Sequence, residues 1–319
     1  MKNLFRVLLI LTLITIISAC GSSNENTNGT NNEENEQEKI TITHELGETD
    51  VHKNPENVVV FDFGMLDTFD YLDIDVTGLA QMNIPEYLEK YEDEQYENIG
   101  SLKEPDLEKI ANIEPDLIVI SGRQSDLYDE LSKLGPVIFL GVDSTRYMES
   151  FKENVKIVGK IFDKEEEVEQ KLNELEEQIE VVKEKAETLN KEALIVLAND
   201  DKISAYGENS RFGLIHDVFG VPTVDKEIDA STHGMDVTFE YVAEKDPDLL
   251  YVVDRSAAIG EDSAAKNIVE NELMKNTKAM KNDNIFYLSP DVWYLSGGGL
   301  LSVQKMVEEV SDSLEKATE

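Results

Sequence analysis

Short apolar runs alternate with amphipathic helical patterns along most of this chain. From about residue 40, four runs predict buried strands, at residues 58–61, 76–79, 117–120 and 137–140. A second series predicts three further strands and a closing helix, at residues 194–197, 249–253, 285–288 and 300–314. Strands that alternate with helices are typical of α/β folds. The pattern therefore predicts two α/β lobes, an N-terminal lobe over 40–162 and a C-terminal lobe over 191–319.

A long amphipathic helix is predicted between the two lobes. Between residues 163 and 190, apolar side chains recur at steps of three and four, and neither Gly nor Pro interrupts the pattern. At 1.5 Å per residue, such a helix is about 40 Å long. Its apolar face could pack on a second copy of the chain as a coiled coil, or the helix could connect the lobes. We expect the connecting helix, a ligand cleft between the lobes and a monomeric chain.

The first 39 residues have the pattern of an exported lipoprotein. Basic residues precede an apolar run, 7–17, that is too short to cross a bilayer comfortably, and small residues and Cys20 follow at the cleavage position. We expect a signal peptide at 1–19, a lipid on Cys20, and a disordered polar tether over 20–39. An ordinary signal peptide with an incidental cysteine is the alternative. The lipid would hold the protein at the outer face of the cytoplasmic membrane, and the acidic, Asn-rich tether favours a Gram-positive cell.

The composition excludes several classes of function. The 319 residues include 67 acidic and 29 basic side chains, which give a formal net charge of -38. A nucleic-acid-binding protein needs a basic face, so nucleic acid is excluded as a partner. A single cysteine forms neither an internal disulfide nor a cysteine zinc site. The sequence also lacks the GxxxxGK[ST], HExxH, CxxC and GxSxG motifs and any GxGxxG after a strand. We therefore expect no intrinsic cofactor.

An internal repeat relates the two lobes. Residues 106–123 align without gaps with residues 238–255, and six of the 18 positions are identical. Each copy predicts a helix, a Pro-Asp turn, a buried strand and then an arginine, Arg123 or Arg255, just past the end of the strand. Ligands bind beyond the carboxyl ends of strands in open α/β sheets. Lobes that face each other would bring both arginines into one cleft.

Arginine is scarce in this chain, so its positions are informative. Only five of the 29 basic residues are arginine, and lysine therefore covers most of the solvated surface. A planar guanidinium suits the bidentate recognition of oxygen anions. Arg211, in a turn before a helix, joins Arg123 and Arg255 as a candidate, whereas Arg146 is expected on the surface. Because an acidic surface repels anions, the capture of an anionic ligand requires a concentrated cationic cleft.

Two loops add candidate contacts for a ligand. His233 is one of four histidines and lies in a loop of small residues, while Trp293 and Tyr294 precede three glycines that open the closing helix. An imidazole nitrogen and a phenolate oxygen are both good ligands of ferric iron. The alternatives are a solvated loop histidine and a pair of core aromatic residues.

The order of lipobox, polar tether, α/β lobe, long helix and second α/β lobe resembles the substrate-binding lipoproteins of iron-siderophore ABC importers. The similarity is greatest to the group that binds ferric catecholates and petrobactin, and it extends from Cys20 to the C-terminus. It implies a class III periplasmic-binding-protein fold and a binding function without catalysis. In this resemblance, Arg123, Arg211 and Arg255 neutralise an anionic ferric siderophore. His233 and Tyr294 complete the iron shell when the siderophore supplies only four oxygens. From its place beside Tyr294, we also expect Trp293 to lie in the cleft and contact the ligand.

The same resemblance implies a membrane partner. Glu108 and Glu240, the glutamates of the repeat, match the positions at which such proteins dock onto an ABC permease dimer with its ATPase. Ordinary surface carboxylates are the alternative.

Two other functions stay open at this point. A haem or cobalamin carrier of the same fold would share the turn motifs, although its less anionic ligand would make three cleft arginines superfluous. An exported enzyme could use His233 as a general base near Tyr294, which requires an orienting partner and a substrate within hydrogen-bond reach.

Overall fold

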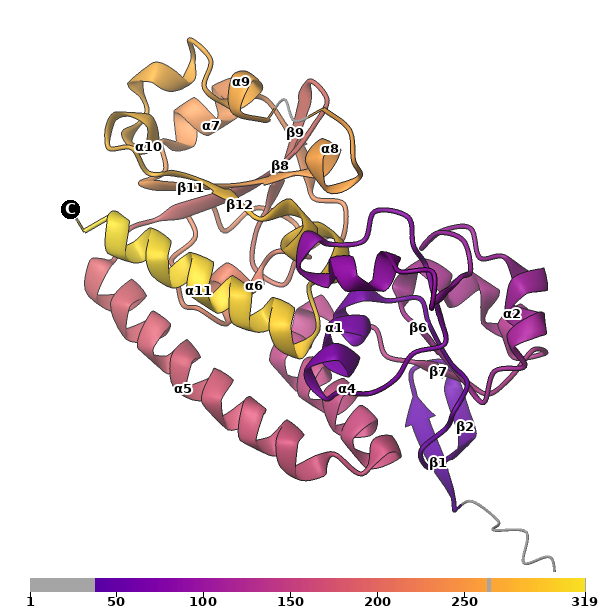
Figure 1. Ribbon diagram of the computed structural model, residues 1–319. Helices are drawn as coiled ribbons and strands as arrows, with labels where there is room; N and C mark the ends of the chain where they lie inside the picture. The colour runs from indigo at the N-terminus through magenta and orange to yellow at the C-terminus, as the bar shows by residue number, and fades with distance from the viewer. Residues whose placement is uncertain (1–37, 263–264, 319) are drawn as a thin grey trace, which may run out of the picture. The chain divides into compact units, whose positions relative to one another are not determined.

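Two five-stranded β-sheets, one from each half of the described chain, organise this computed structural model (Figure 1). The structure describes residues 38–262 and 265–318. The signal peptide at 1–19, Cys20 and nearly all of the tether lie outside the described residues, so what was predicted for them stays a prediction. None of the described helices is long and apolar enough to cross a membrane.

The sheet of the first lobe is parallel throughout, with the strand order β5-β4-β3-β6-β7. Its strands are β3 (Val58–Val60), β4 (Gly78–Leu79), β5 (Glu97–Asn98), β6 (Leu117–Ile120) and β7 (Val137–Phe139). β3, β6 and β7 are buried along their whole length, as expected for parallel strands that are covered on both faces. The strands predicted at 58–61, 117–120 and 137–140 are confirmed, and the run at 76–79 shortens to the two-residue β4.

Helices form the crossovers that parallel strands require. The first lobe contains α1 (Phe63–Tyr71), α2 (Leu107–Ile113), α3 (Tyr128–Leu131), α4 (Tyr147–Phe162) and 3-10 turns at Glu86–Glu92, Gly122–Leu127 and Ser144–Arg146. An antiparallel hairpin of β1 (Lys39–His44) and β2 (Gly47–His52) precedes the sheet. The start of α1 is fixed by Asp62, whose carboxylate accepts the backbone N–H of Met65 at 2.9 Å.

The sheet of the second lobe is mixed, with the order β10-β9-β8-β11-β12. Its strands are β8 (Ala193–Asn199), β9 (Lys202–Tyr206), β10 (Met235–Val237), β11 (Leu249–Asp254) and β12 (Ile285–Leu288). β8, β11 and β12 are parallel, whereas β9 and β10 are antiparallel to their neighbours. β9 and β10 were not predicted, because their short sequences mix polar with apolar residues and contain no continuous apolar run.

Short helices and one long helix complete the second lobe. They are α6 (Leu214–Asp217), α7 (Phe239–Lys245), α8 (Arg255–Ala258), α9 (Ala265–Val269), α10 (Lys278–Lys281), α11 (Leu300–Lys316), a 3-10 turn at Met274–Asn276 and a π-helix at Asp291–Ser296. α11 confirms the closing helix predicted at 300–314. The π-helix was not predicted.

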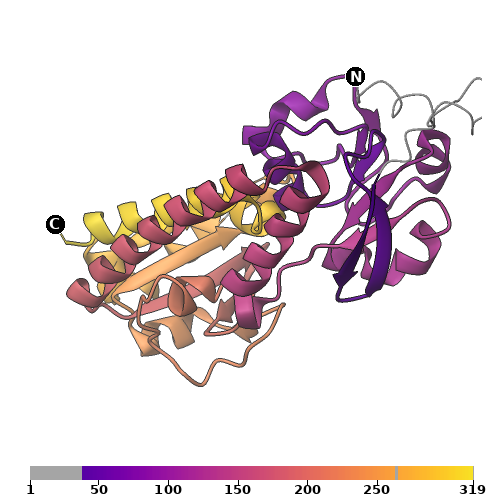
Figure 2. The same cartoon turned by 90° about the horizontal axis from the view of Figure 1, so that it is seen from below.

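A single helix, α5 (Glu165–Leu189), links the two lobes. Its apolar residues, Val168, Leu172, Leu175, Ile179, Val182 and Ala186, are all buried. They pack against α4 and α11 of the same chain, and Figures 1 and 2 show α5 and α11 side by side. This apolar face of α5 is therefore buried within the chain and is not available for a coiled coil with a second copy. The predicted fold class, two α/β lobes joined by one long helix, is confirmed.

One hydrophobic core runs through both lobes. It includes the first sheet, α5, α11 and the face of the second sheet that carries Ile195 and Leu197. Leu194 and Val196 point to the opposite face and join a smaller cluster with α7 and α9, as the two-residue period of a strand requires. Because the larger core is continuous, the described residues 38–262 and 265–318 belong to one compact unit.

The internal repeat folds in the same way twice. In both copies, the aspartate after the turn proline holds the start of a neighbouring strand. Asp116 accepts the backbone N–H of the residue before β3 at 2.9 Å, and Asp248 accepts that of the residue before β8 at 3.1 Å. β6 and β11 follow these turns, so Arg123 and Arg255 leave corresponding ends of the two sheets.

Candidate functional site

Two adjoining cavities lie near the carboxyl ends of β6 and β11. The smaller has a volume of about 190 Å³ and the larger a volume of about 580 Å³. They share four lining residues, Arg211, Thr232, His233 and Tyr294. Arg123 from the first lobe lines the larger cavity, and Arg255 from the second lobe lines the smaller one. Together the cavities form the ligand cleft expected between the lobes.

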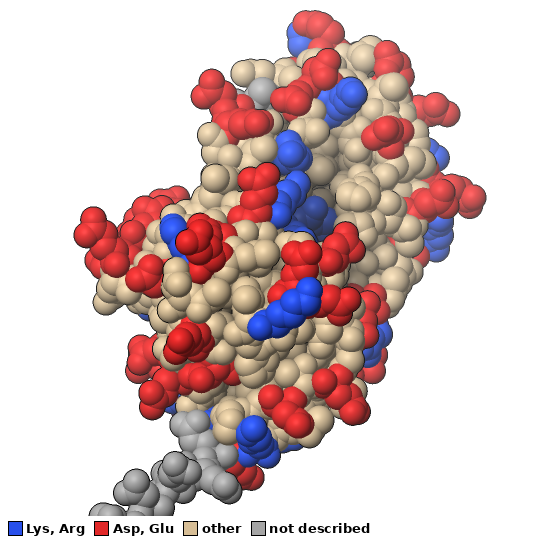
Figure 3. All heavy atoms as spheres, turned by 90° about the vertical axis from the view of Figure 1, so that its right-hand side faces the viewer, with Lys and Arg blue, Asp and Glu red and all other residues tan. Residues whose placement is uncertain are grey.

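Lys and Arg side chains gather in a hollow on one face of the molecule, while acidic side chains are spread over the surface around it (Figure 3). Five cations line the two cavities: Arg123, Arg211, Arg255, Lys103 and Lys202. The lining also includes two acids, Asp62 and Asp236. The cleft is therefore cationic within a strongly acidic protein.

The three arginines selected from the sequence meet at one residue, Tyr294. Arg123 donates from Nη2 to the Tyr294 carbonyl at 2.9 Å and from Nη1 to the Leu295 carbonyl at 3.5 Å. Arg211 donates from Nη2 to the same Tyr294 carbonyl at 2.5 Å, and its guanidinium carbon lies 4.3 Å from the centroid of the Tyr294 ring. Arg255 donates from Nε to the Tyr294 hydroxyl at 3.2 Å. The structure thus brings the three guanidinium groups together, and their contact with a ligand stays a prediction.

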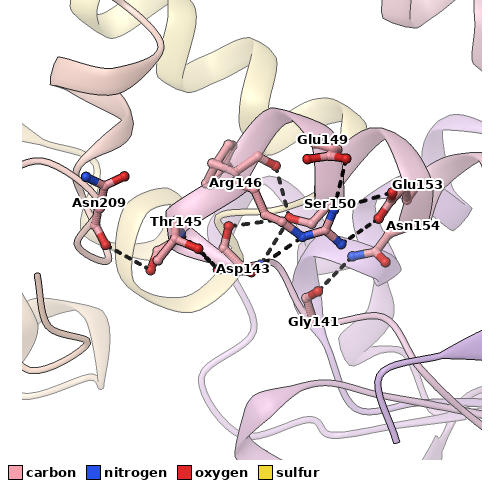
Figure 4. A network of polar contacts seen from close by, with 11 residues as sticks. Gly141, Asp143, Thr145, Arg146, Glu149, Ser150, Glu153, Asn154 and Asn209 are labelled. Carbon is pink, nitrogen blue, oxygen red and sulfur yellow. Dashed lines mark hydrogen bonds and ion pairs between the residues drawn. The ribbon is translucent and has the colours of Figure 1, made fainter. Parts of the chain in front are cut away.

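None of these three arginines takes part in an ion pair with another described residue. Arg146 differs, because it is exposed and pairs with carboxylates near the start of α4 (Figure 4). Arg146 therefore lies on the surface, as expected. The cleft arginines have uncharged partners, so their positive charge is available to an anion.

The surroundings of Tyr294 and Arg211 shift the pKa of each side chain. Burial raises the pKa of Tyr294, but the hydrogen bond from Arg255 and the charges of Arg211 and Arg255 outweigh burial, and the pKa is lowered from 10.0. Burial and the charge of Arg123 lower the pKa of the Arg211 guanidinium, which stays protonated at neutral pH. The Tyr294 phenol is therefore easier to ionise than an ordinary tyrosine.

His233 lines both cavities and is exposed in the loop that leads to β10. Its backbone N–H donates to the Ser231 hydroxyl at 3.1 Å. Across residues 38–262 and 265–318, no group of three or more His, Cys, Asp and Glu side chains is placed to hold a metal ion. A ferric ion in this cleft would therefore depend on its chelator for most of its ligands.

Trp293 lies in the wall of the larger cavity, but it is almost inaccessible. Its exposed fraction is 2 %, and its indole N–H donates to Glu309 on α11 at 2.7 Å. The indole is thus anchored to α11. This burial limits the predicted contact of Trp293 with a ligand. Most of its surroundings are those of a core aromatic residue, which was the alternative.

Glu108 and Glu240 lie in the first turns of α2 and α7, one on each lobe. Both side chains are exposed, and neither lines the cleft. Their positions leave them free for an external partner. Docking onto a permease stays a prediction.

Some residues of the cleft carried no signal in the sequence. Lys202 lies on β9 and Lys103 precedes α2, and nothing in the pattern distinguishes them from the other lysines. The apolar wall of the larger cavity also comes from scattered positions, Phe139, Leu140, Val142, Tyr147, Leu214 and Met306. Only a prediction of β9 would have pointed to Lys202.

Two α/β lobes, a connecting helix and a cleft between the lobes define a class III ligand-binding protein. The model of the family described as periplasmic binding protein matches residues 59–292, and the chain belongs to this family. The resemblance inferred from the sequence is confirmed at this level.

Relatives within this family carry names that refer to iron chelates. The petrobactin-binding protein YclQ of Bacillus subtilis is 53% identical over 284 residues, which cover 88% of this chain and 90% of the relative. Its crystal structure has a TM-score of 0.86 and covers 88% of this chain and 99% of that chain. The ferric-anguibactin-binding protein FatB of Vibrio anguillarum is 30% identical over 277 residues, covering 85% of this chain and 86% of the relative.

A catecholate-binding protein of known structure is also similar. The crystal structure of the periplasmic catecholate-siderophore binding protein VctP from Vibrio cholerae has a TM-score of 0.82 and 35% sequence identity. It covers 86% of this chain and 100% of that chain.

Proposed function

We propose that this chain captures a ferric siderophore of the catecholate or petrobactin type in its cleft and delivers it to an ABC importer. The observation that carries the proposal is the convergence of Arg123, Arg211 and Arg255 on Tyr294 without an ion-pair partner among the described residues. A ferric catecholate has negative charge on its oxygens. Guanidinium N–H groups bind such oxygens through charge-assisted hydrogen bonds. The 53% identity to the petrobactin-binding protein of Bacillus subtilis supports the same ligand class.

The charge distribution suits a receptor that binds an anion at one place. The chain has a formal net charge of -38, so most of its surface repels an anionic chelate. The cationic cleft reverses this effect locally. A bound chelate would therefore be held by few residues, and each cleft arginine would matter to affinity.

Tyr294 and His233 supply ligands that a tetradentate siderophore lacks. A phenolate is a hard anionic oxygen that suits ferric iron, and the lowered pKa of Tyr294 favours its ionised form. His233 offers an imidazole nitrogen from the loop that leads to β10. A hexadentate siderophore fills the iron shell by itself and needs neither residue.

Delivery places the protein outside the cytoplasm. A lipid on Cys20 and the tether over 20–39 hold the monomeric chain at the outer face of the cytoplasmic membrane of a Gram-positive cell. Glu108 and Glu240 dock, one from each lobe, onto an ABC permease dimer that its ATPase drives. Their exposure on separate lobes supports this role.

A fluorescence titration tests the ligand class. Trp293 is the one tryptophan of the chain and lies in the cleft wall, so a ferric chelate bound there is expected to quench its emission. The purified protein is titrated with ferric petrobactin, ferric catecholates, haem and cobalamin. Saturable quenching by the ferric siderophores is expected. Saturation by haem or cobalamin, without a response to any ferric siderophore, would replace this proposal with the alternative carrier.

The described residues give the His233 ring no hydrogen-bonded orienting group, which leaves the enzyme alternative without support.

A further inference from the structure

The π-helix Asp291–Ser296 ends with carbonyl groups that the backbone does not satisfy. The N–H of Gly297 donates to the Val292 carbonyl at 2.9 Å, which closes the last turn. Among the described residues, no backbone N–H donates to the carbonyls of Tyr294 or Leu295. A partly buried carbonyl without a partner is unfavourable, so these groups need other donors.

The backbone donors that follow the π-helix are already engaged in starting α11. The N–H groups of Gly298 and Gly299 donate to the Ser302 hydroxyl at 3.4 and 2.9 Å. The N–H of Leu300 donates to the Thr68 hydroxyl of the first lobe at 3.1 Å. The end of the π-helix therefore depends on side chains for its capping.

Cleft arginines provide that cap. Arg123 and Arg211 both donate to the Tyr294 carbonyl, and Arg123 also reaches the carbonyl of Leu295. The Tyr147 hydroxyl donates to the carbonyl of Gly297, just after the π-helix, at 3.0 Å. Cations near a helix C-terminus also interact favourably with its partial negative charge.

The capping contacts come from both lobes and fix the ring as well as the backbone. Arg123 and Tyr147 belong to the first lobe, whereas Arg211 and Tyr294 belong to the second. Arg211 stacks on the Tyr294 ring at 4.3 Å while it holds the carbonyl. With the backbone and the ring held in this way, the Tyr294 hydroxyl lies 3.2 Å from Nε of Arg255.

We propose that Arg123 and Arg211 are positioning residues for Tyr294, which cap the π-helix and hold the tyrosine ring against Arg255. This role precedes ligand binding, because every contact exists within the protein itself. It stands whichever ligand the cleft takes. The three cations and the phenol are thereby assembled before an anion arrives.

Two measurements on the ligand-free protein test this role. The first is hydrogen exchange at the Gly297 amide, whose hydrogen bond closes the π-helix. The second is the flip rate of the Tyr294 ring, measured by NMR on protein with labelled tyrosine and assigned with Tyr294→Phe. Arg123→Ala is expected to speed exchange at Gly297 by about tenfold, as the loss of a hydrogen bond to a charged donor predicts. It is also expected to speed flipping of the Tyr294 ring, although Arg123 contacts the Tyr294 carbonyl and not its hydroxyl.

Further variants separate positioning from charge. Arg211→Lys keeps a cation but removes the planar stack on the ring, and faster flipping of the Tyr294 ring is expected. Arg146→Ala is the matched control, since Arg146 contacts other elements, and it is expected to change neither measurement. An unchanged flip rate of the Tyr294 ring in Arg123→Ala overturns the proposal, even if exchange at Gly297 is faster, because the cap would then be structural only. If Arg123→Ala does not fold, Arg123→Lys, which lacks the planar fork that reaches both carbonyls, is judged by the same criterion, and a wild-type flip rate overturns the proposal.

Discussion

Arg146 and the cleft arginines are chemically identical but differ in what surrounds them. Arg146 has a side chain that is 43% exposed and lies 3.5, 3.2 and 2.8 Å from the carboxylates of Asp143, Glu149 and Glu153 (Figure 4). The carboxylates cancel its charge, and water screens each pair. Exposed ion pairs of this kind contribute about 0 to 1 kcal/mol each.

The arginines of the cleft retain their charge. Their partners are the carbonyls of Tyr294 and Leu295, the Tyr294 phenol and the Asn199 amide oxygen. Burial lowers the pKa of Arg211, because it destabilises the charged form of the guanidinium. Such an arrangement is unfavourable for stability alone, but it leaves positive charge for an anion. The comparison teaches that the partners of an arginine, more than its presence, indicate a binding role.

Asp67 is the acidic counterpart of the cleft arginines, because it is a buried ionisable group whose hydrogen-bond partners are uncharged. It is 0% exposed between α1 and α11 and accepts the backbone N–H groups of Leu301 and Ser302, each at 3.0 Å. The Tyr87 hydroxyl lies 3.1 Å from Asp67 and 2.8 Å from the Ser296 hydroxyl. The Tyr87 hydroxyl donates to the Asp67 carboxyl. Burial raises the pKa of Asp67 to about 7.

The largest effect is expected from Asp67→Asn at neutral and alkaline pH. The pKa of Asp67 is higher in the folded state, about 7, than the ordinary value of 3.8, so the folded state binds the proton more tightly. The stability that this proton provides is complete below about pH 4 and is lost as the pH rises through 7. An amide cannot ionise, but its NH2 group cannot accept an N–H as both oxygens of Asp67 do, so the variant also loses a hydrogen bond at every pH. The stability of the wild type relative to the variant is therefore expected to fall by up to roughly 4 kcal/mol between pH 4 and pH 9.

Urea unfolding of both proteins from pH 4 to pH 9 measures this difference. The rest of the acidic surface is common to the two proteins, so the difference isolates the one carboxyl group. A difference in stability that stays constant from pH 4 to pH 9, or that moves in favour of the wild type as the pH rises, would mean that the ionised Asp67 is not destabilising at the start of α11. In that case the burial of Asp67 would not oppose its charge as burial opposes the charge of Arg211.

The next largest effect concerns ligand affinity. Arg123→Ala, Arg211→Ala and Arg255→Ala are each expected to weaken the binding of a ferric siderophore by about 1.5 to 3 kcal/mol, the range for a hydrogen bond to a charged group. Titration calorimetry with ferric petrobactin measures the change. Unaltered affinity in all three variants would remove the basis for a cationic binding cleft.

Tyr294→Phe distinguishes two modes of iron binding. With a tetradentate siderophore, the wild type is expected to show a visible phenolate-to-iron absorption band that the variant lacks. Affinity for that ligand is expected to fall about tenfold, the size of one lost charge-assisted contact. A hexadentate siderophore is expected to bind both proteins almost equally. An equal loss for both siderophores would count against direct coordination by Tyr294.

Much of the fold could be predicted from the sequence, because buried parallel strands and long helices have strong local patterns. β6 is a continuous apolar run, and α5 has one apolar face over 25 residues. β9 and β10 were missed, since their place in the sheet is set by the pairing of β9 with β8 and of β10 with β9, and not by their own residues. The π-helix was missed for a similar reason, because its geometry depends on side chains from both lobes.

The candidate site was predictable where a residue was rare or repeated. Arg123 and Arg255 stood out through the repeat, and Arg211 through the scarcity of arginine. Their meeting at Tyr294 could not be predicted, because Arg123 and Arg211 reach its carbonyl where the end of the π-helix lacks backbone donors, and Arg255 reaches its hydroxyl. The burial of Trp293 against Glu309 could not be predicted either, since Glu309 is one of many acidic residues on helices.

The smallest effect is expected from Arg146→Ala, which tests the other side of the comparison. Its three ion pairs are exposed and share one guanidinium, so their loss is expected to change the free energy of unfolding by about 0.5 kcal/mol or less. Siderophore affinity is expected to stay unchanged, because Arg146 lines neither cleft cavity. Thermal unfolding in low and in high salt measures the first expectation, and titration with ferric petrobactin measures the second. A loss of affinity as large as that of Arg211→Ala would show that long-range charge, and not the lack of ion-pair partners in the cleft, determines which arginines attract the ligand.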